Sequence, residues 1–498
     1  MDEIQQQAGR VSYAPSPPEE FSGRQEELRH LLTILSQAEE QGRAVMISGP
    51  SGIGKSSLLN RLAYEVLERS GGRYPPLLRA EIFDLPGMIF SAFRELLNEL
   101  RRSGAPVRRE GIPGGEGMRE AVRYADDVFE KYAAPVEPIG LFPKDGEEII
   151  GIFARAPEVG YDRVYQAFEE LLTELGREAS MADRVAAVLV DDVHLASDHD
   201  RRLLRDVVRN LPPGIFLAFT CRTEEGDGSG YAKMQGDIRD LGAEEVQLHG
   251  MRGDEIREFA KRRFDLSVDD TTAAFLEEVS GNPFSLMACF NALQSRGLAP
   301  SRENVAEIIG GTKDPADLIY TALPPFVRAW AEDLCVLNPP FPAPVMACML
   351  IPLETGVAPT VDRLLESGMF RRGQGGGYAF AHPLLQEHCR QNLPEETRVS
   401  LNARAADCFE RSMHRLPGRL HVLLSLAGHL FDAREYGKAA DLNLEIGLRF
   451  HHRGDHDTAL ILTDRAIVSA EHLGDDALLT VAERQRDLIL QKASGVGR

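Results

Sequence analysis

Apolar residues along the chain occur either in short continuous runs or at helical spacing. The runs predict strands at 44–48, 77–83, 185–190, 214–220 and 245–248. The run at 185–190 ends in two acidic residues, and its uninterrupted apolar character is typical of a central parallel strand that is buried on both faces. Helical periodicity separates the runs at 22–35, 56–68, 86–102 and 163–175. Strands that alternate with helices predict an α/β domain with a parallel sheet.

The first predicted helix has a start signal of its own. Ser22 and Gln25 have the spacing of a capping box, so we expect this helix to begin near Ser22. Residues 1–20 contain three prolines and are expected to form a flexible tail. Residues 103–160 are rich in Gly and Pro and are expected to form an insertion that is partly helical around 120–132.

After residue 250 the pattern is mostly helical. Helices are predicted at 254–264, 271–279, 284–293 and 302–309, which would form a small all-α unit. Three more helices, at 325–336, 344–349 and 361–368, precede two short β segments at 369–371 and 378–380, and together these predict a winged helix. From residue 397 onward the periodicity is helical to the end. Two Tyr/His-x-x-Ala segments, at 436–439 and 456–459, indicate degenerate tetratricopeptide-like helix pairs.

Composition narrows the functional classes. The chain has 498 residues, which is too many for a single hydrophobic core. Its 77 acidic and 56 basic residues give a net charge of -21, so nucleic-acid binding would require a local basic patch. No apolar run has the length of a membrane span, and the polar N-terminal residues do not resemble a signal peptide, so we expect a cytoplasmic protein that does not bind membranes. The six cysteines lack CxxC spacing and are expected to be reduced, buried thiols.

One segment carries a specific chemical signal. The sequence from Gly49 to Ser56, GPSGIGKS, matches the phosphate-binding pattern GxxxxGK[ST] in full. Glycines let backbone N–H groups point at phosphate oxygens, and the helix that follows adds the positive end of its dipole. We expect Lys55, the only lysine in the first 130 residues, to reach the β and γ phosphates of ATP or ADP, and the Ser56 hydroxyl to ligate Mg²⁺. The predicted phosphate-binding residues are Gly49, Pro50, Ser51, Gly52, Ile53, Gly54, Lys55, Ser56 and Ser57.

Two further positions at strand ends fit the same chemistry. Asp191 and Asp192 end the 185–190 run, and a P-loop protein needs a carboxylate at the end of a neighbouring strand to hold Mg²⁺. We therefore assign Asp191 to the metal and Asp192 to orienting or deprotonating water. Thr220 and Arg222 follow the 214–219 run, where a polar group and a cation are placed to sense the γ-phosphate; a solvated strand end remains the alternative.

Six short segments in order make the chain resemble STAND NTPases, signal-transduction ATPases with numerous domains, whose ATPase module is similar to that of replication-initiator AAA proteins. The segments are FSGRQEEL at 21–28, the phosphate-binding loop, LVDDVH at 189–194, TCR at 220–222, GNP at 281–283 and FAHP at 380–383. They cover about residues 21–390.

The resemblance implies further site residues. Gly23 and Arg24 would lie near the adenine, Arg222 would contact the γ-phosphate, and Pro283 would belong to a turn that closes over the base. His382 occupies a place where related switches contact the nucleotide phosphates, although a buried structural histidine is an equal alternative. Gln25 stands where the family usually has Glu, and Leu195 stands where a Trp often follows the two acids. No arginine finger is assignable, so slow hydrolysis is expected.

These observations predict five segments. They are a flexible tail at 1–20, an AAA-type P-loop ATPase core at 21–250 with the insertion at 103–160, a helical lid at 251–315, a winged helix at 316–393 and tetratricopeptide-like helices at 394–498.

The leading interpretation is an ATP-binding signalling switch with low ATPase turnover. The bound nucleotide would control how the domains are arranged and whether the chain forms a homo-oligomer. It would also control the binding of a partner, a protein or a small ligand, at the C-terminal helices. A DNA-binding initiator-like ATPase is the first alternative. Arg371 and Arg372 beside the predicted wing favour it, whereas Glu366, Glu387 and the net charge oppose it. The second alternative is a non-hydrolysing scaffold that binds ATP structurally.

Overall fold

The computed structural model describes most of the chain. The described residues are 21–70, 77–82, 96, 115–132, 161–196, 198–223, 235–236, 241–311, 314–350, 357–366, 369–372, 377–413, 419–452 and 456–493. The predictions for the tail at 1–20, for nearly all of the helix at 86–102 and for most of the insertion at 103–160 lie outside them. The chain divides into two compact units, one that ends at Pro324 and one that begins at Pro325, with 85–89 and 127–164 grouped with the second.

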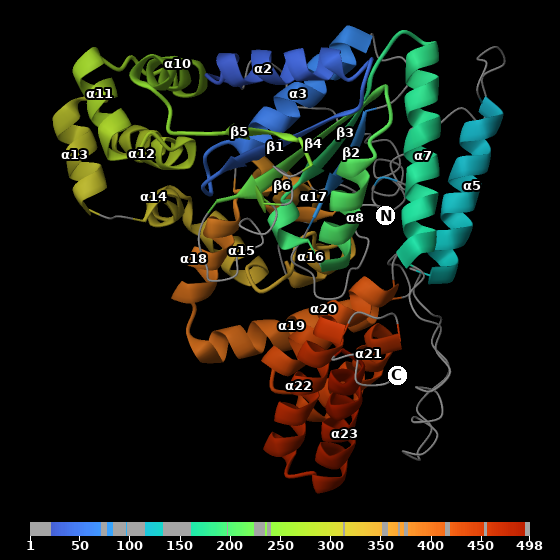
Figure 1. Cartoon of the computed structure of the whole chain (residues 1–498). Coiled ribbons are helices and arrows are strands. Elements are labelled where there is room, and N and C mark those ends of the chain that lie inside the picture. The colour runs from blue at the N-terminus through green and yellow to red at the C-terminus, as the bar shows by residue number, and fades with distance from the viewer. Residues whose placement is uncertain are drawn as a thin grey trace. The chain divides into compact units, whose positions relative to one another are not determined.

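The first unit is built on a parallel sheet (Figure 1). Within the described residues the sheet has five strands in the order β2-β3-β4-β1-β5, and every neighbouring pair is parallel. The strands are β1 (Arg43–Gly49), β2 (Leu78–Glu81), β3 (Ala186–Asp191), β4 (Ile215–Arg222) and β5 (Glu244–Gln247). All five predicted strands are confirmed, each within two residues at either end. The predicted P-loop α/β fold, followed by a largely helical region, is therefore the fold of this chain.

Helices cover both faces of the sheet, as Figure 1 shows. Alternate residues of β3 face opposite ways: Leu189 packs in the core cluster with α3, whereas Val188 and Val190 line a small cavity with residues of α7 and α8. All six residues of β3 are buried, as the apolar run predicts. The helices around the sheet are α2 (Gln25–Gln37), α3 (Lys55–Ser70), α7 (Tyr161–Met181) and α8 (Asp198–Arg209), and α5 (Gly115–Tyr132) lies against α7.

Two local expectations were wrong. The first helix begins at Gln25 rather than near Ser22, because Gly23 and Arg24 adopt positive φ angles of 72° and 59° and form a turn in place of a capping box. Helix α8 was missed, because its sequence, DHDRRLLRDVVR, is mostly charged and keeps only a narrow apolar stripe. That stripe, which includes Leu203 and Val207, is buried against the sheet.

A helical layer completes the first unit. It contains α10 (Gly253–Phe264), α11 (Asp270–Val279), α12 (Pro283–Arg296), α13 (Arg302–Gly311) and α14 (Pro315–Ala322). Three aromatic rings, Phe259, Phe264 and Phe290, pack against one another and join α10 to α12. Helix α14 packs on α12, so it groups with this layer although it falls beyond residue 315.

The second unit starts with helices and a hairpin. Helices α15 (Pro325–Leu334), α16 (Ala343–Met349) and α17 (Val357–Glu366) precede the antiparallel strands β6 (Phe370–Arg372) and β7 (Tyr378–Phe380), and α18 (Pro383–Asn392) follows. The rings of Phe341, Phe370 and Phe380 form the centre of this part.

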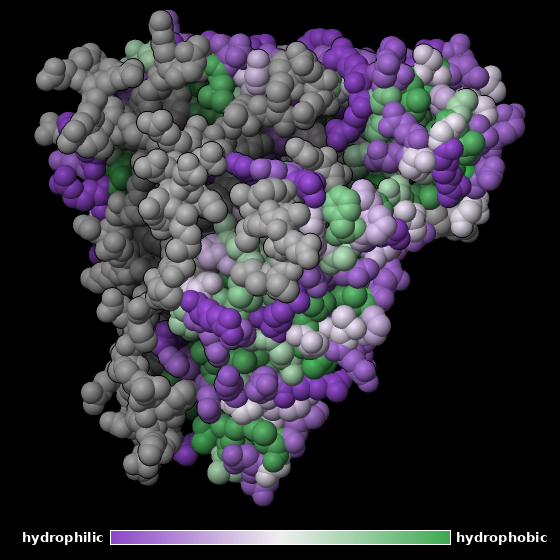
Figure 2. All heavy atoms as spheres, turned by 180° about the vertical axis from the view of Figure 1, so that it is seen from behind, coloured by the Kyte–Doolittle hydropathy of each residue, from purple (hydrophilic) through white to green (hydrophobic). Residues whose placement is uncertain are grey.

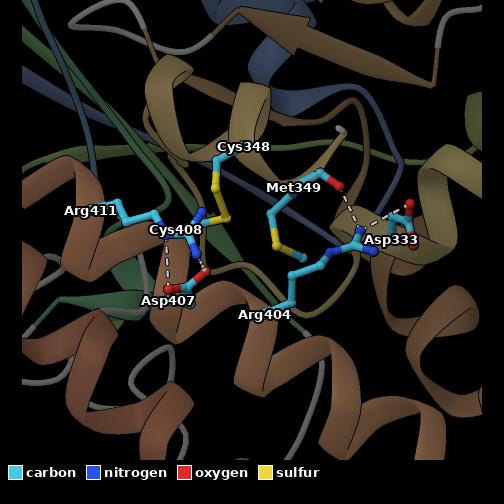
Figure 3. The surroundings of a disulfide bond; sticks show 7 residues. All are labelled: Asp333, Cys348, Met349, Arg404, Asp407, Cys408 and Arg411. Carbon is cyan, nitrogen blue, oxygen red and sulfur yellow. Dashed lines mark hydrogen bonds and ion pairs between the residues drawn. A yellow bond between two sulfur atoms is a disulfide. The ribbon is translucent and has the colours of Figure 1, made fainter. Parts of the chain in front are cut away.

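The expectation that the cysteines are all reduced was wrong. Cys348 of α16 and Cys408 of α19 (Glu395–Ser412) form a disulfide bond, shown in Figure 3. These helices pack on each other, which brings two cysteines 60 residues apart to a Cα–Cα distance of 5.7 Å. Sequence spacing carries no sign of this contact. Beside the disulfide, Arg404 bonds the carbonyl oxygen of Met349 and pairs with Asp333 at 3.0 Å. The other four cysteines, Cys221, Cys289, Cys335 and Cys389, are buried thiols.

After α19 the described chain consists of helices that pack on their neighbours in the sequence. Helices α20 (Arg419–Asp432), α21 (Tyr436–His452), α22 (His456–Leu473) and α23 (Asp476–Ala493) each pack on the one before. Ala439 and Ala459, which the sequence pairs as equivalent positions, are fully buried near the starts of α21 and α22. Exposed apolar side chains on α22 and α23 include Ile461, Leu473 and Val481. In the face drawn in Figure 2, hydrophobic residues stand among hydrophilic ones. Of the helices that the structure describes, none combines the length and apolarity that crossing a membrane requires.

Candidate functional site

The phosphate-binding loop joins strand β1, which lies between β4 and β5, to helix α3. Gly49, Gly52 and Gly54 have φ angles of 155°, 75° and 98°, which only glycine adopts without strain. A Cβ placed on Gly52 would collide with Phe284, whereas one on Gly54 would meet only the Pro283 ring, at 3.9 Å. Gly54 therefore has room for one more atom beside Pro283 at the N-terminus of α3, where backbone N–H groups attract anions.

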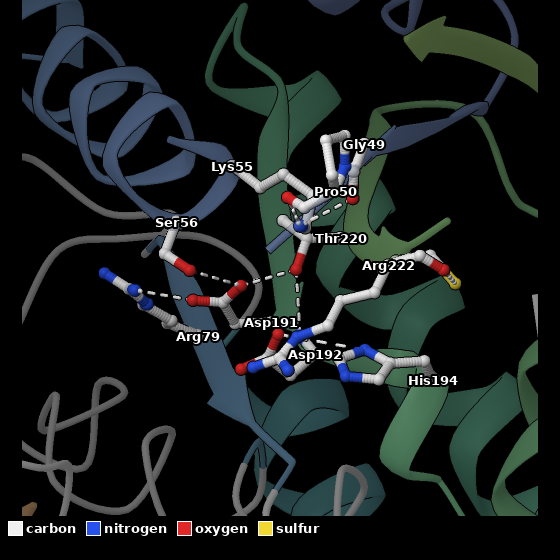
Figure 4. Close-up of polar contacts among 11 residues, drawn as sticks. Gly49, Pro50, Lys55, Ser56, Arg79, Asp191, Asp192, His194, Thr220 and Arg222 are labelled. Atoms are coloured by element: carbon white, nitrogen blue, oxygen red, sulfur yellow. Dashed lines mark hydrogen bonds and ion pairs between the residues drawn. The ribbon is translucent and has the colours of Figure 1, made fainter. Parts of the chain in front are cut away.

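Lys55 lies in this loop and is buried. Its Nζ donates hydrogen bonds of 2.8 Å to the carbonyl oxygens of Gly49 and Pro50 (Figure 4). The Ser51 and Ile53 carbonyl oxygens each accept a bond from another part of the unit, and the Ile53 side chain is buried. Ser57 is exposed on the first turn of α3.

A chain of polar contacts links the loop to β3 and β4. The Ser56 hydroxyl donates to Asp191 Oδ1 at 3.1 Å, and the Thr220 hydroxyl donates to the same oxygen. Thr220 Oγ1 also accepts the backbone N–H of Asp192 at 2.8 Å. The expectation that Asp191 would end a strand neighbouring β1 was wrong, because β4 lies between them. Thr220 on this intervening strand is the residue that joins both acids.

Asp192 stands at a sharp turn after β3. It has a φ of 59° and precedes the short helix η2 (Val193–Leu195). His194 Nδ1 lies 3.8 Å from Asp192 Oδ1, and Figure 4 shows the Arg222 side chain pointing toward these two residues. Burial, together with the charges of Arg222 and Lys55, lowers the pKa of His194 to about 3, so this imidazole is neutral near neutral pH.

Two residues of this cluster were not predicted as site residues. His194 belongs to the LVDDVH segment that carries the resemblance, but the sequence analysis gave the histidine itself no role. Arg79 comes from the edge strand β2, and its guanidinium lies 3.5 Å from Asp191 Oδ2. An arginine within a four-residue strand gives no sequence signal of this contact, because it depends on β2 lying beside β3.

Gly23 and Arg24 pack against the phosphate-binding loop from the N-terminal side. The Arg24 side chain is buried and donates to the carbonyl oxygens of Ile53, at 3.2 Å, and of His249. Its backbone N–H donates to Glu255 of α10 at 2.8 Å. A Cβ on Gly23 would meet the Glu255 carboxylate at 2.9 Å. Arg24 thus ties the loop to the first helix of the helical layer.

The turn before α12 also rests on the loop. Asn282 Nδ2 donates to the Ser51 carbonyl oxygen at 2.9 Å, and the backbone N–H of Phe284 lies 3.3 Å from the Gly52 carbonyl oxygen. The same side chain caps α12, because Asn282 Oδ1 accepts the Phe284 N–H at 2.9 Å. Pro283 lies next to Gly54. The structure therefore brings Pro283 to the phosphate-binding loop.

His382 belongs to the second unit. It is the N-cap of α18, and its Nδ1 accepts the backbone N–H of Leu384 at 3.2 Å. Local capping is thus one role that the structure gives this residue.

The residues present fit a magnesium nucleotide. Mg²⁺ prefers hard oxygen ligands, and a hydroxyl and a carboxylate converge 3.1 Å apart at Ser56 and Asp191. Phosphates fit the positive-φ glycines and the ammonium group of Lys55.

Comparison with known proteins agrees with this geometry. Residues 20–219 match the family described as AAA ATPase domain. No curated protein matches the chain.

Three of the solved structures that resemble this chain differ in how much of each chain is aligned. A STAND protein with a tetratricopeptide repeat sensor from Pyrococcus horikoshii is 15% identical over 97% of this chain and 67% of its own, with a TM-score of 0.48. A Walker-type ATPase of Pyrococcus abyssi is 16% identical over 76% of this chain and 99% of its own, with a TM-score of 0.33. The Orc1 protein of Aeropyrum pernix, solved in complex with DNA, is 15% identical over 77% of this chain and 94% of its own, with a TM-score of 0.33.

These identities and TM-scores are low, so the assignment rests on the family match, which covers the phosphate-binding loop, Asp191 and most of the sheet. Over residues 20–219 the chain is similar to the AAA ATPase domain family, and the solved structures that resemble it include a STAND protein and an Orc1 protein.

Proposed function

We propose that this chain is an ATP-binding, slowly ATP-hydrolysing signalling switch of the STAND type, whose nucleotide state controls domain arrangement and partner binding. The observation that carries the proposal is the convergence of Lys55, Ser56 and Asp191 at the carboxyl ends of the parallel strands, beside the positive-φ glycines of the loop. Nucleotides bind α/β sheets outside the carboxyl ends of the strands, where these groups lie.

The chain's own residues have separate tasks in this proposal. The loop from Gly49 to Ser57 binds the phosphates, Ser56 and Asp191 hold Mg²⁺, and Thr220 fixes Asp191 by a hydrogen bond. Bound Mg²⁺ would neutralise charge on the phosphates. Asp192 accepts a proton from water or orients it, and Arg222 is the cation that faces the γ-phosphate.

Coupling to the helical layer follows from direct contacts. Asn282 and Phe284 bond the loop backbone, and Arg24 bonds it from the other side while its backbone N–H binds Glu255. A change in loop conformation on nucleotide binding therefore alters the contacts of α10 and α12. Differential contact of this kind is what a nucleotide switch requires.

The proposal keeps the domain division given by the sequence. It comprises a tail at 1–20, an ATPase core at 21–250, a lid at 251–315 to which α14 adds residues up to 322, a winged helix over the rest of 316–393 and tetratricopeptide-like helices at 394–498. Gly23, Arg24 and Pro283 take the adenine side of the site, and His382 contacts the nucleotide phosphates in one of the two states. Exposed apolar residues on α22 and α23 support partner binding at the C-terminal helices.

Nucleotide binding is tested with a fluorescent methylanthraniloyl ATP. We expect Lys55→Ala to weaken its affinity about 100-fold or more, because charge-assisted hydrogen bonds of about 1.5–3 kcal/mol each are lost. Lys261→Ala, which removes an exposed lysine of the same unit, is the control. Equal affinity for both variants would remove the basis of the proposal.

Hydrolysis and switching are tested next. Asp192→Asn should keep binding and lower turnover by about 10²–10⁴, whereas Asp183→Asn, at an exposed aspartate that also has a positive φ, should not. Wild-type protein without turnover would favour the scaffold alternative. Light scattering with ADP and then with a non-hydrolysable ATP analogue and Mg²⁺ should show growth from monomer to a defined oligomer. An unchanged mass that grows only when duplex DNA is added would favour the initiator alternative.

A further inference from the structure

Arg79 places a buried positive charge beside the carboxylate to which we assign Mg²⁺. The Arg79 and Asp191 side chains are only 8% and 3% exposed, and NH2 of Arg79 lies 3.5 Å from Oδ2 of Asp191. NH1 of Arg79 bonds Asn60 Oδ1 on α3, which fixes the guanidinium between β2 and the helix that carries Ser56. Figure 4 shows the arginine approaching Asp191 from the side opposite Thr220.

The two oxygens of Asp191 therefore have different partners. Oδ1 accepts the hydroxyls of Ser56 and Thr220, and Oδ2 faces Arg79. A buried carboxylate is stable only when it is paired, and Arg79 pairs it without any metal. A divalent cation that binds the same carboxylate must share its negative charge with the fixed guanidinium of Arg79. The two cations also repel each other.

We propose that Arg79 is the standing counter-ion of Asp191, and that Mg²⁺ binds at this site in competition with it. Arg79 is a positioning residue whose charge sets the magnesium affinity of the site. Nucleotide then binds the protein with a weak dependence on Mg²⁺, because Asp191 remains paired when the metal is absent. The inference rests on the proposed function, since it assumes the nucleotide site at the phosphate-binding loop.

Neutralising Arg79 should therefore strengthen magnesium binding. The measurement is the affinity of the full chain for methylanthraniloyl ADP across a magnesium titration that starts in EDTA. In Arg79→Gln the magnesium midpoint should fall about tenfold or more, the lower end of the range by which a nearby charge changes proton binding by a carboxylate. Arg79→Lys keeps the charge and should stay near the wild-type midpoint.

A double-mutant cycle separates the charge effect from a structural one. In an Asp191→Asn background, Arg79→Gln should no longer shift the midpoint, because the carboxylate that the two cations share is gone. Should Arg79→Gln fold poorly in EDTA, its melting temperature serves as the second readout, and Mg²⁺ with ADP should raise it more than it raises that of the wild type.

The outcomes are distinct. An unchanged or raised magnesium midpoint in Arg79→Gln, or an equal shift in Arg79→Lys, would overturn the role of Arg79 while the nucleotide site stands. Wild-type protein that does not bind the fluorescent ADP at any Mg²⁺ concentration would overturn the proposed function, and this inference with it.

Discussion

Replacing Thr220 with valine removes one hydroxyl group and nearly preserves the size of the side chain. Thr220 is completely buried, and its hydroxyl makes two hydrogen bonds in the site. It donates to Asp191 Oδ1 and accepts the backbone N–H of Asp192 at 2.8 Å. Valine would leave the Asp192 N–H without this acceptor and Asp191 without one of its donors.

The cost of this change follows from the two bonds. A bond to a charged carboxylate contributes about 1.5–3 kcal/mol, and the bond from the N–H about 1 kcal/mol. The free energy of unfolding should therefore fall by about 2–4 kcal/mol. For a domain of this size each kcal/mol lowers the melting temperature by about 2–4 °C, so the expected shift is about 4–16 °C. Turnover should fall as well, because both carboxylates lose a positioning contact.

The assay is thermal unfolding followed with and without ADP. The transition that ADP raises identifies the unit that binds nucleotide, and its midpoint is compared between Thr220→Val and Thr220→Ser. Serine keeps the hydroxyl and should restore most of the stability and the turnover. Equal midpoints for the two variants would show that the hydroxyl does not hold the two acids, and would refute the network drawn from the geometry.

Three other predictions concern separate contacts. Asn282→Ala should lower the melting temperature of the ADP-sensitive transition by about 2–8 °C, since it removes the α12 cap and the bond to Ser51, worth about 1–2 kcal/mol together. Asn282→Asp keeps the cap and should lose less; equal melting temperatures for the two variants would contradict the capping role of Asn282. Cys408→Ser should destabilise the second unit by up to about 4 kcal/mol, the chain-entropy value for a loop of 60 residues. The measurement is denaturant unfolding of the oxidised and the reduced protein. Identical unfolding curves for the two forms would contradict the bond to Cys348. His194 has a folded pKa of about 3, well below the ordinary 6.5, so between these values the unfolded state binds more protons. Stability is thus complete above pH 6.5 and falls as pH drops toward 3, by at most about 1.4 kcal/mol per unit, and His194→Gln should flatten the slope.

The sequence predicted the sheet and the phosphate-binding loop well, because both depend on local signals. A continuous apolar run ending in acids describes β3 wherever it lies in the sheet, and glycine spacing describes the loop directly. Helix α8 was not predicted, because its local sequence is mostly charged. Its stability comes from the buried apolar stripe at Leu203 and Val207.

Contacts between distant segments could not be predicted in this way. The bond of Thr220 to Asp191 requires the strand order, which places β4 between β1 and β3. The pairing of Arg79 requires β2 to lie beside β3, and the Cys348–Cys408 bond requires α16 to pack on α19. The helix start at Gln25 was likewise decided by a distant partner, Glu255, which accepts the Arg24 N–H.

The charges of the side chains around the phosphate-binding loop also favour a nucleotide as the ligand of this site. The chain as a whole carries a net charge of -21, yet the residues labelled in Figure 4 include three cations, Lys55, Arg79 and Arg222, beside the carboxylates of Asp191 and Asp192. Cations gathered in one place attract a ligand of opposite charge. One of the three cations is committed to Asp191, and Lys55 and Arg222 both lie close enough to His194 to help keep it neutral. The polyphosphate of a nucleotide is the anion that this arrangement suits, and magnesium would add positive charge where Arg79 already supplies some. A site built in this way should therefore retain the nucleotide more firmly than it retains the metal.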